Sequence, residues 1–98
     1  MMTTKLKWDP KDPQDIADYW VTCATFLQES GETITTADVT VPDDIELILT
    51  DWSDTEVRVR LGGGVAGKYD IVVVIDTTSG ERFRMKAILT VADRVIKQ

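Results

Sequence analysis

The chain has 98 residues, enough for one domain with a single core and too few for two ordinary domains. Its residues are 43% hydrophobic and 29% charged, which is typical of a soluble globular protein and excludes a disordered chain. The longest apolar run covers residues 71–75, far short of the roughly 20 residues that a membrane span needs, and no apolar signal core follows the first lysines. We therefore expect no membrane partner and no secretory export.

The chain contains no histidine and one cysteine, Cys23. Without an imidazole there is no Ser/His or Cys/His nucleophile system and no His-ligated metal. One cysteine makes no disulfide within the chain, so we interpret Cys23 as a buried structural thiol in a reducing compartment. The acidic residues lack the ligand pattern of a calcium loop. We expect no catalytic residue, no metal and no cofactor.

The negative charge is concentrated in the first half of the chain. Residues 1–50 carry a net charge of −7 and residues 51–98 a net charge of +1. Five cations alternate along two expected strands: Arg58, Arg60, Arg82, Arg84 and Lys86. A nucleic-acid site needs clustered cations, whereas this alternation fits a solvated sheet face, so we expect no nucleic-acid partner.

Residues 1–15 are predicted to form an extended arm, because Pro10 and Pro13 suit neither a helix interior nor a strand interior. Trp8 on this arm either anchors it to its own domain or contacts a partner, and we favour the anchor. Residues 16–98 are predicted to form the domain itself.

Residues 14–30 fit two interpretations. Apolar residues at three-to-four spacing, between Pro13 and Gly31, fit an amphipathic helix. The run from Tyr19 to Phe26 is instead rich in β-branched and aromatic types and fits a strand. The local pattern leaves this choice open.

The rest of the chain is predicted to be all β. Turn signals separate predicted strands at 33–41, 45–49, 56–61, 69–75 and 82–91. The clearest alternation places Val57, Val59 and Leu61 on the buried face of one strand. We expect Leu47 and Leu49 to point inward as well, and the strand at 69–75, apolar on both faces, to be central. Short strands at this spacing favour a β-sandwich or barrel.

Residues 62–68 have the GxxxxGK spacing of a phosphate-binding loop. Tyr69 stands where a magnesium-binding Ser or Thr is needed, and a strand follows where a helix is needed, so we reject nucleotide binding. We interpret the segment as an interstrand loop in which glycine allows positive φ or close backbone approach. Tyr69 then fits a tyrosine corner, with its hydroxyl bonded to nearby backbone.

Several short motifs follow one another along the chain: Asp9-Pro10-Lys11-Asp12-Pro13, Asp18-Tyr19, Gly31-Glu32-Thr33-Ile34, Thr40-Val41-Pro42, Leu61 with Gly63-Gly64-Val65-Ala66-Gly67-Lys68, and Gly80-Glu81-Arg82. This series resembles a family of short bacteriophage virion proteins, the fiber-tail adaptors. The chain departs from the family in having Thr22-Cys23-Ala24 where members pair Asp with Trp, and in Tyr69, which arrives one residue early. The resemblance implies an all-β, immunoglobulin-like antiparallel β-sandwich in which residues 18–27 are strand.

The resemblance also implies a non-enzymatic structural protein of the virion, at the tail or the join between tail and fibers. Its expected partners are other phage virion proteins, with a homo-oligomer in the particle. The alternatives are a capsid decoration or head-tail connector protein, and a carbohydrate-binding module that uses Trp8, Trp20 or Trp52 as a stacking platform. The residues expected to contact partners are Trp8, Asp9, Pro10, Lys11, Pro13, Asp51 and Trp52. We expect deletion of residues 1–13 to leave the fold intact and to abolish incorporation into particles.

Overall fold

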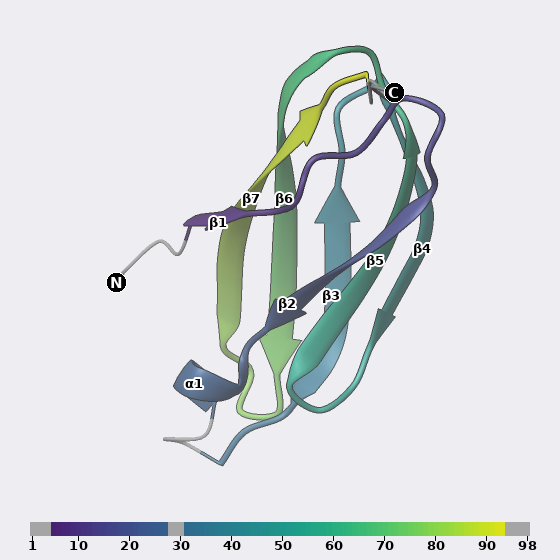
Figure 1. Cartoon of the computed structure of the whole chain (residues 1–98). Coiled ribbons are helices and arrows are strands. Elements are labelled where there is room, and N and C mark those ends of the chain that lie inside the picture. Colours follow the sequence, from purple (N-terminus) through teal and green to yellow (C-terminus); the bar gives the residue numbers. More distant parts are fainter. Residues whose placement is uncertain (1–4, 28–30, 94–98) are drawn as a thin grey trace.

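The computed structural model describes residues 5–27 and 31–93. Its strands are β1 (Lys5–Lys7), β2 (Ala17–Thr22), β3 (Ile34–Thr40), β4 (Ile45–Trp52), β5 (Glu56–Gly63), β6 (Gly67–Thr77) and β7 (Arg82–Val91), and a single-turn helix, α1 (Ala24–Leu27), follows β2. The strands form two sheets, with the orders β1-β7-β6-β3 and β2-β5-β4, packed face to face (Figure 1). The predicted all-β sandwich is confirmed. No helix of the described residues is long and apolar enough to cross a membrane.

The inner faces of the two sheets form the core. Val57, Val59 and Leu61 of β5 are fully buried, as their alternation with charged residues predicts. They pack with buried aliphatic residues of β6 and β7, which form the middle of the opposite sheet. The prediction that the strand at 69–75 is central is confirmed, because β6 lies between β7 and β3. Each such buried side chain stabilises the fold by about 1.5–3 kcal/mol relative to an exposed one.

Residues 14–27 combine the two predicted alternatives. The strand β2 ends at Thr22, and one helical turn follows, in which the backbone N–H of Leu27 donates to the carbonyl of Cys23 at 3.1 Å. The resemblance implied that residues 18–27 are strand throughout. This is wrong, because the strand ends at Thr22 and residues 24–27 are helical. The strand pattern holds as far as Cys23, since Tyr19, Val21 and Cys23 are all buried. Residues 28–30 of the ambiguous stretch lie outside the described residues.

The prediction that Leu47 and Leu49 both point inward is wrong. The register of β4 against β5 shifts between these two residues, so that Leu47 lies opposite Leu61 but Leu49 lies opposite Arg60. Because Arg60 is on the outer face of β5, Leu49 is carried to the outer face with it. Leu47 lies on the same side as the buried Leu61 but is 37% exposed at the sheet edge, and the buried residue of this strand is Ile45.

The glycine-rich segment holds the predicted loop between β5 and β6, which is limited to residues 64–66 because β5 ends at Gly63 and β6 begins at Gly67. Gly64 has a φ of 96°, and a Cβ there would lie 2.9 Å from Cδ1 of Ile45. A side chain at this position would meet both an unfavourable backbone conformation and the core. The tyrosine corner is also confirmed: the hydroxyl of Tyr69 donates to the carbonyl of Val65 at 2.8 Å and accepts from its N–H at 3.2 Å.

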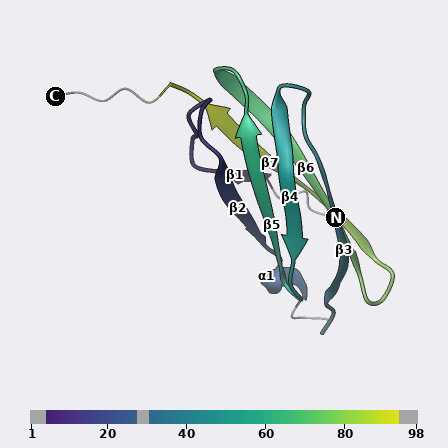
Figure 2. The same cartoon turned by 90° about the vertical axis from the view of Figure 1, so that its right-hand side faces the viewer.

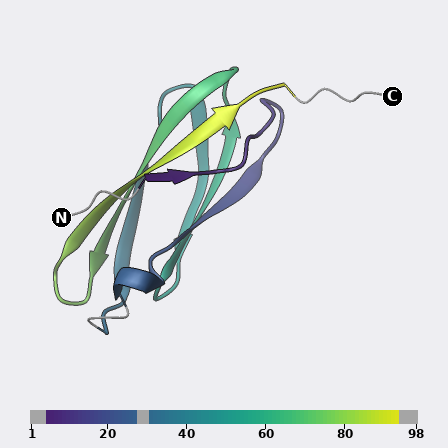
Figure 3. The same ribbon diagram turned by 60° about the vertical axis from the view of Figure 1, so that its left-hand side comes forward.

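The N-terminal segment lies along the edge of the larger sheet. Strand β1 runs parallel to β7 (Figure 3), an arrangement that the sequence pattern did not predict. Beyond β1 the contact continues, because the N–H groups of Trp8 and Lys11 donate to the carbonyls of Ile88 and Thr90, each at 3.0 Å. Trp8 is 7% exposed and belongs to the core. These contacts argue that deletion of residues 1–13 would destabilise the fold.

Candidate docking surfaces

Trp8 packs within its own domain, which confirms the anchoring role favoured from the sequence. Its ring stacks on Tyr19, with centroids 4.8 Å apart and planes 16° from parallel. Its indole N–H is buried and has no acceptor among the described residues. A partner could reach this ring only if the arm detached, so Trp8 holds the arm in place rather than presenting a surface.

Lys11 is also buried, with 2% of its surface exposed. Its ammonium group donates to the carbonyls of Asp12 and Asp15, both at 2.8 Å. A buried cation is costly unless polar groups replace its water, and these carbonyls do so. Lys11 therefore fixes the turn over residues 11–15. This role was not predicted from the sequence, in which the only signal for it is a lysine enclosed by aspartates and prolines.

The other predicted contact residues of the arm remain accessible. Asp9 and Pro10 are exposed and Pro13 is half-buried. We call these three residues the arm-end surface. They lie beside the end of β7, because the backbone of Lys11 forms a bridge with Val91.

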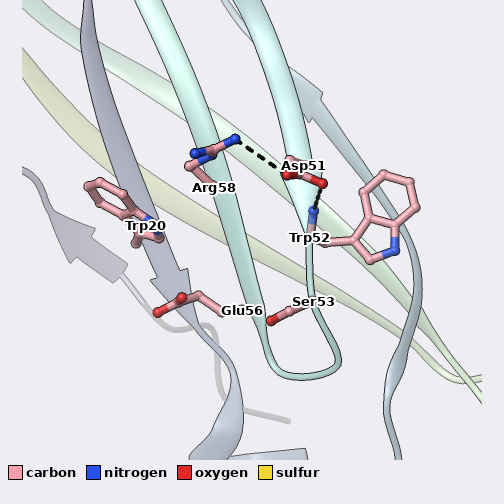
Figure 4. A pocket seen from close by; sticks show the side chains of 6 residues that line it. All are labelled: Trp20, Asp51, Trp52, Ser53, Glu56 and Arg58. Atoms are coloured by element: carbon pink, nitrogen blue, oxygen red, sulfur yellow. Dashed lines mark hydrogen bonds and ion pairs between the residues drawn. The ribbon is translucent and has the colours of Figure 1, made fainter.

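Asp51 and Trp52 are both exposed at the end of β4. They line an open pocket of about 220 Å³, together with Trp20, Ser53, Glu56 and Arg58 (Figure 4). We call this the β4-end pocket. The carboxylate of Asp51 accepts from the backbone N–H of Trp52 at 2.9 Å and lies 3.4 Å from the Arg58 guanidinium. The Nε–H of Arg58 is buried without an acceptor among the described residues.

Trp20 was considered from the sequence only as a glycan platform, and the structure places it on the β4-end pocket with 51% of its surface exposed. The signal for this exposure is present in the sequence, since Trp20 alternates with the inward residues Tyr19 and Val21. Trp20 lies directly opposite Arg58 on the outer face of the β2-β5-β4 sheet.

The same outer face carries an ion pair and an apolar group farther from the pocket. Arg60 donates to both carboxylate oxygens of Asp18, at 2.7 and 3.2 Å. This hydrogen bonding lowers the pKa of Asp18 and raises the pKa of Arg60. Beyond it, the exposed side chains of Ile16 and Ile48 flank Gly62, whose missing side chain leaves room for them.

The outer face of the β1-β7-β6-β3 sheet is mainly charged. Arg82 donates to Asp76 at 2.7 Å, and Lys86 lies 3.7 Å from Asp70. Two of the cations that alternate along β7 are therefore balanced by carboxylates of the neighbouring strand. Such pairing reduces the field that an extended polyanion would meet.

No group of three or more Cys, Asp and Glu side chains in the described part of the chain is placed to hold a metal ion. Cys23 is fully buried, which confirms its predicted burial, and its thiol lies 4.0 Å from the sulfur of Met85. Burial raises the pKa of this thiol to about 11, and the nearby Glu56 carboxylate adds to the effect. A thiol in this environment is unreactive.

The predicted contact residues form two separate groups. The arm-end surface lies near the end of β7, whereas Asp51 and Trp52 lie at the opposite end of the sandwich (Figure 1). The antiparallel pairing of β4 with β5 places Trp52 beside the start of β5, since Trp52 lies opposite Val57. The other end of β4, at Ile45, lies opposite Gly63 at the end of β5. Accessible residues of the predicted contact set therefore lie at both ends of the sandwich.

Comparisons with known proteins give a likeness of fold and a family. No curated protein matches the chain. Among solved structures, an endo-fucoidan hydrolase from glycoside hydrolase family 107 matches with a TM-score of 0.64 and 11% identity. The match covers 95% of this chain and only 13% of the hydrolase, so it supports the fold alone. Residues 11–90 match the model of a family described as "Podophage GP4 fiber-tail adaptor protein gp77".

Proposed function

Because the chain belongs to the podophage GP4 fiber-tail adaptor family, we propose that it is a non-enzymatic virion component that binds a tail protein and a fiber protein together. The observation that carries this proposal is the family match itself. It spans β2 to β6 completely and all of β7 except Val91. The match therefore concerns every strand of the sandwich except β1, rather than one motif.

The strand order supports an immunoglobulin-like fold. In such domains strands B, E and D form one sheet, and strands C, F and G form the other. Here β2-β5-β4 corresponds to B-E-D and β7-β6-β3 to G-F-C, with β1 added beside β7 in place of a strand next to β2. The hydrogen bonds between Tyr69 and Val65 fit the tyrosine corner of these domains.

An adaptor needs two contact surfaces that do not interfere with each other. The arm-end surface and the β4-end pocket meet this need, because they lie at opposite ends of the sandwich (Figure 1). The pocket has features of a protein contact site, namely two exposed tryptophans and an arginine, the residue types that dominate binding energy at interfaces.

The location in the virion can be tested with gold-labelled antibody against this protein on purified particles. We expect label at the tail or its fibers. Label over the head would contradict the adaptor and favour a capsid decoration or connector protein. Unlabelled particles would remove the virion role and favour the carbohydrate-binding module, which a titration of tryptophan fluorescence with host glycans would then detect.

The two-ended arrangement can be tested with purified tail and fiber proteins. We expect Trp52→Ala to weaken the binding of one partner by more than about tenfold, as at an interface hot spot, and to leave the other unchanged. The double variant Asp9→Ala/Pro10→Ala should weaken only the second partner. Val65→Ala, in an exposed loop outside both surfaces, is the control. Loss of both partners through one surface would contradict the arrangement.

A further inference from the structure

One edge of β2 has no neighbouring strand among the described residues. Strand β1 pairs with β7 in the opposite sheet, so no strand of the described chain covers the side of β2 that faces away from β5 (Figure 2). An uncovered strand edge presents unpaired backbone groups and is a template for pairing with another strand.

The residues that present these groups follow from the pairing of β2 with β5. The N–H of Cys23 donates to the carbonyl of Thr55 at 2.7 Å, one step beyond the opposed residues Thr22 and Glu56. In an antiparallel pair, residues alternate between bonding to the partner strand and pointing away from it. Residues 17, 19, 21 and 23 therefore bond to β5, and the backbone groups of residues 18, 20 and 22 point to the free edge.

The other sheet edges carry features that discourage strand pairing. Strand β1 has three residues and two lysines, and the registers of β3 and β4 shift between Ile34 and Thr36 and between Leu47 and Leu49. Short length, lysines and bulges are the usual protection of an edge. The register of β2 runs unbroken over six residues that include neither lysine nor proline. Among the described strands, β2 is the unprotected edge.

We propose that β2 of one copy pairs antiparallel with β2 of a second copy about a two-fold axis at Trp20. In this register the three residues of one strand whose backbone groups point to the free edge, 18, 20 and 22, pair with residues 22, 20 and 18 of the other strand. Trp20 lies opposite Trp20 of the second copy, and Asp18 lies opposite Thr22. Six backbone hydrogen bonds result, because each of the three residues in each copy donates one. The two β2-β5-β4 sheets become one continuous sheet.

The side chains favour this register. The outer face brings together the two half-exposed Trp20 rings, and cross-strand aromatic pairs stabilise antiparallel strands. Asp18 meets the neutral Thr22, and its own charge is already paired with Arg60. No like charges therefore face each other across the new strand pair.

The dimer is expected to be weak. A pair of short strands buries less than the roughly 1,600 Å² of a standard interface. Each copy also carries a net charge of −6, and this repulsion falls as salt screens it. In a particle, many copies held side by side would raise the effective concentration. Only the argument about copies in a particle rests on the proposed function. The pairing of two β2 strands depends on the sequence and fold of this chain and not on its role.

The test is sedimentation equilibrium of the full chain at roughly 10 μM to 1 mM, the range of weak interfaces. We expect the mass to rise from 11.0 kDa toward twice that value, and to rise further in high salt. Trp20→Glu should raise the dimer dissociation constant by more than about tenfold, because it opposes two charges at the axis. Val65→Glu places the same charge at an exposed apolar side chain away from β2 and should leave the constant unchanged.

Hydrogen exchange by NMR identifies the edge itself. The amides of Asp18, Trp20 and Thr22 should exchange more slowly as the protein concentration rises, while those of Tyr19 and Val21, already bonded to β5, should not change. A chain that stays monomeric to about 1 mM, or a dimer that Trp20→Glu leaves intact, would overturn the proposal. Either result leaves the adaptor role standing, because binding to the tail and fiber proteins is measured separately.

Discussion

Trp8 lies face to face on Tyr19, with ring centroids 4.8 Å apart, and this stack joins the N-terminal segment to the inner face of β2. Trp8 comes from the segment that follows β1 along β7, whereas Tyr19 lies in the opposite sheet. The stack therefore links the two layers of the sandwich, and the arm completes the core.

Trp8→Ala is expected to lower the free energy of unfolding by about 3–5 kcal/mol, the usual cost of removing a buried large aromatic side chain. Urea unfolding followed by far-ultraviolet circular dichroism measures the change. Trp52→Ala removes a tryptophan that is 40% exposed and should cost much less. Equal losses in the two variants would contradict a core role for the arm.

Tyr69→Phe is expected to lower the free energy of unfolding by about 1 kcal/mol, because it removes the two hydrogen bonds between the hydroxyl and the backbone of Val65. The midpoint of urea unfolding should fall without a change in slope. Lys68→Ala, at the exposed neighbouring position, serves as the control and should stay within about 0.5 kcal/mol of the parent. A Tyr69→Phe chain as stable as the parent would show that the hydrogen bonds of the tyrosine corner contribute nothing to the free energy of unfolding.

Strict alternation made the strands at the middle of each sheet predictable. In β5 every second residue from Val57 to Leu61 is buried, and β7 has the predicted bounds. Both strands pair on two sides, and neither carries the extra residue of a bulge. Prediction failed at Leu47 and Leu49, where a register shift moves side chains between faces without changing the residue pattern.

The contact surfaces were predictable only in part. Exposure of Asp51 and Trp52 followed from a turn signal, which is local. The burial of Lys11 depends on carbonyl groups that its own turn supplies, and the β1–β7 pairing depends on residues about 80 positions apart. Non-local pairing of three residues leaves no periodic signal in a sequence.

Cys23 is expected to resist thiol reagents in the folded chain. Burial raises its pKa to about 11, so the thiolate is at least about 100-fold scarcer near neutral pH than in an exposed cysteine. The rate of reaction with a disulfide reagent, measured in buffer and in urea, should differ by that factor or more. Rapid labelling of the native chain would show that the core opens at this site.

The ion pair of Asp76 with Arg82 predicts how stability depends on acid. Arg82 donates to one carboxylate oxygen of Asp76 at 2.7 Å and Thr36 to the other at 3.1 Å, and both bonds lower the pKa of Asp76 below its ordinary value of 3.8. A carboxyl with a lowered folded-state pKa stabilises the fold when it is ionised. Its contribution is therefore complete above the ordinary pKa and is lost as the pH falls through the lower, folded-state value.

Asp76→Asn removes this contribution at every pH. We expect the variant to be less stable than the parent between about pH 5 and 7, and the two chains to converge as the pH falls through the lowered pKa. Urea unfolding at a series of pH values measures the difference. Asp70→Asn removes one charge from the same face of the same strand, where the carboxylate lies 3.7 Å from Lys86, and should show a smaller difference. A gap between parent and Asp76→Asn that persists undiminished in strong acid would assign the effect to the side chain's packing rather than to its charge.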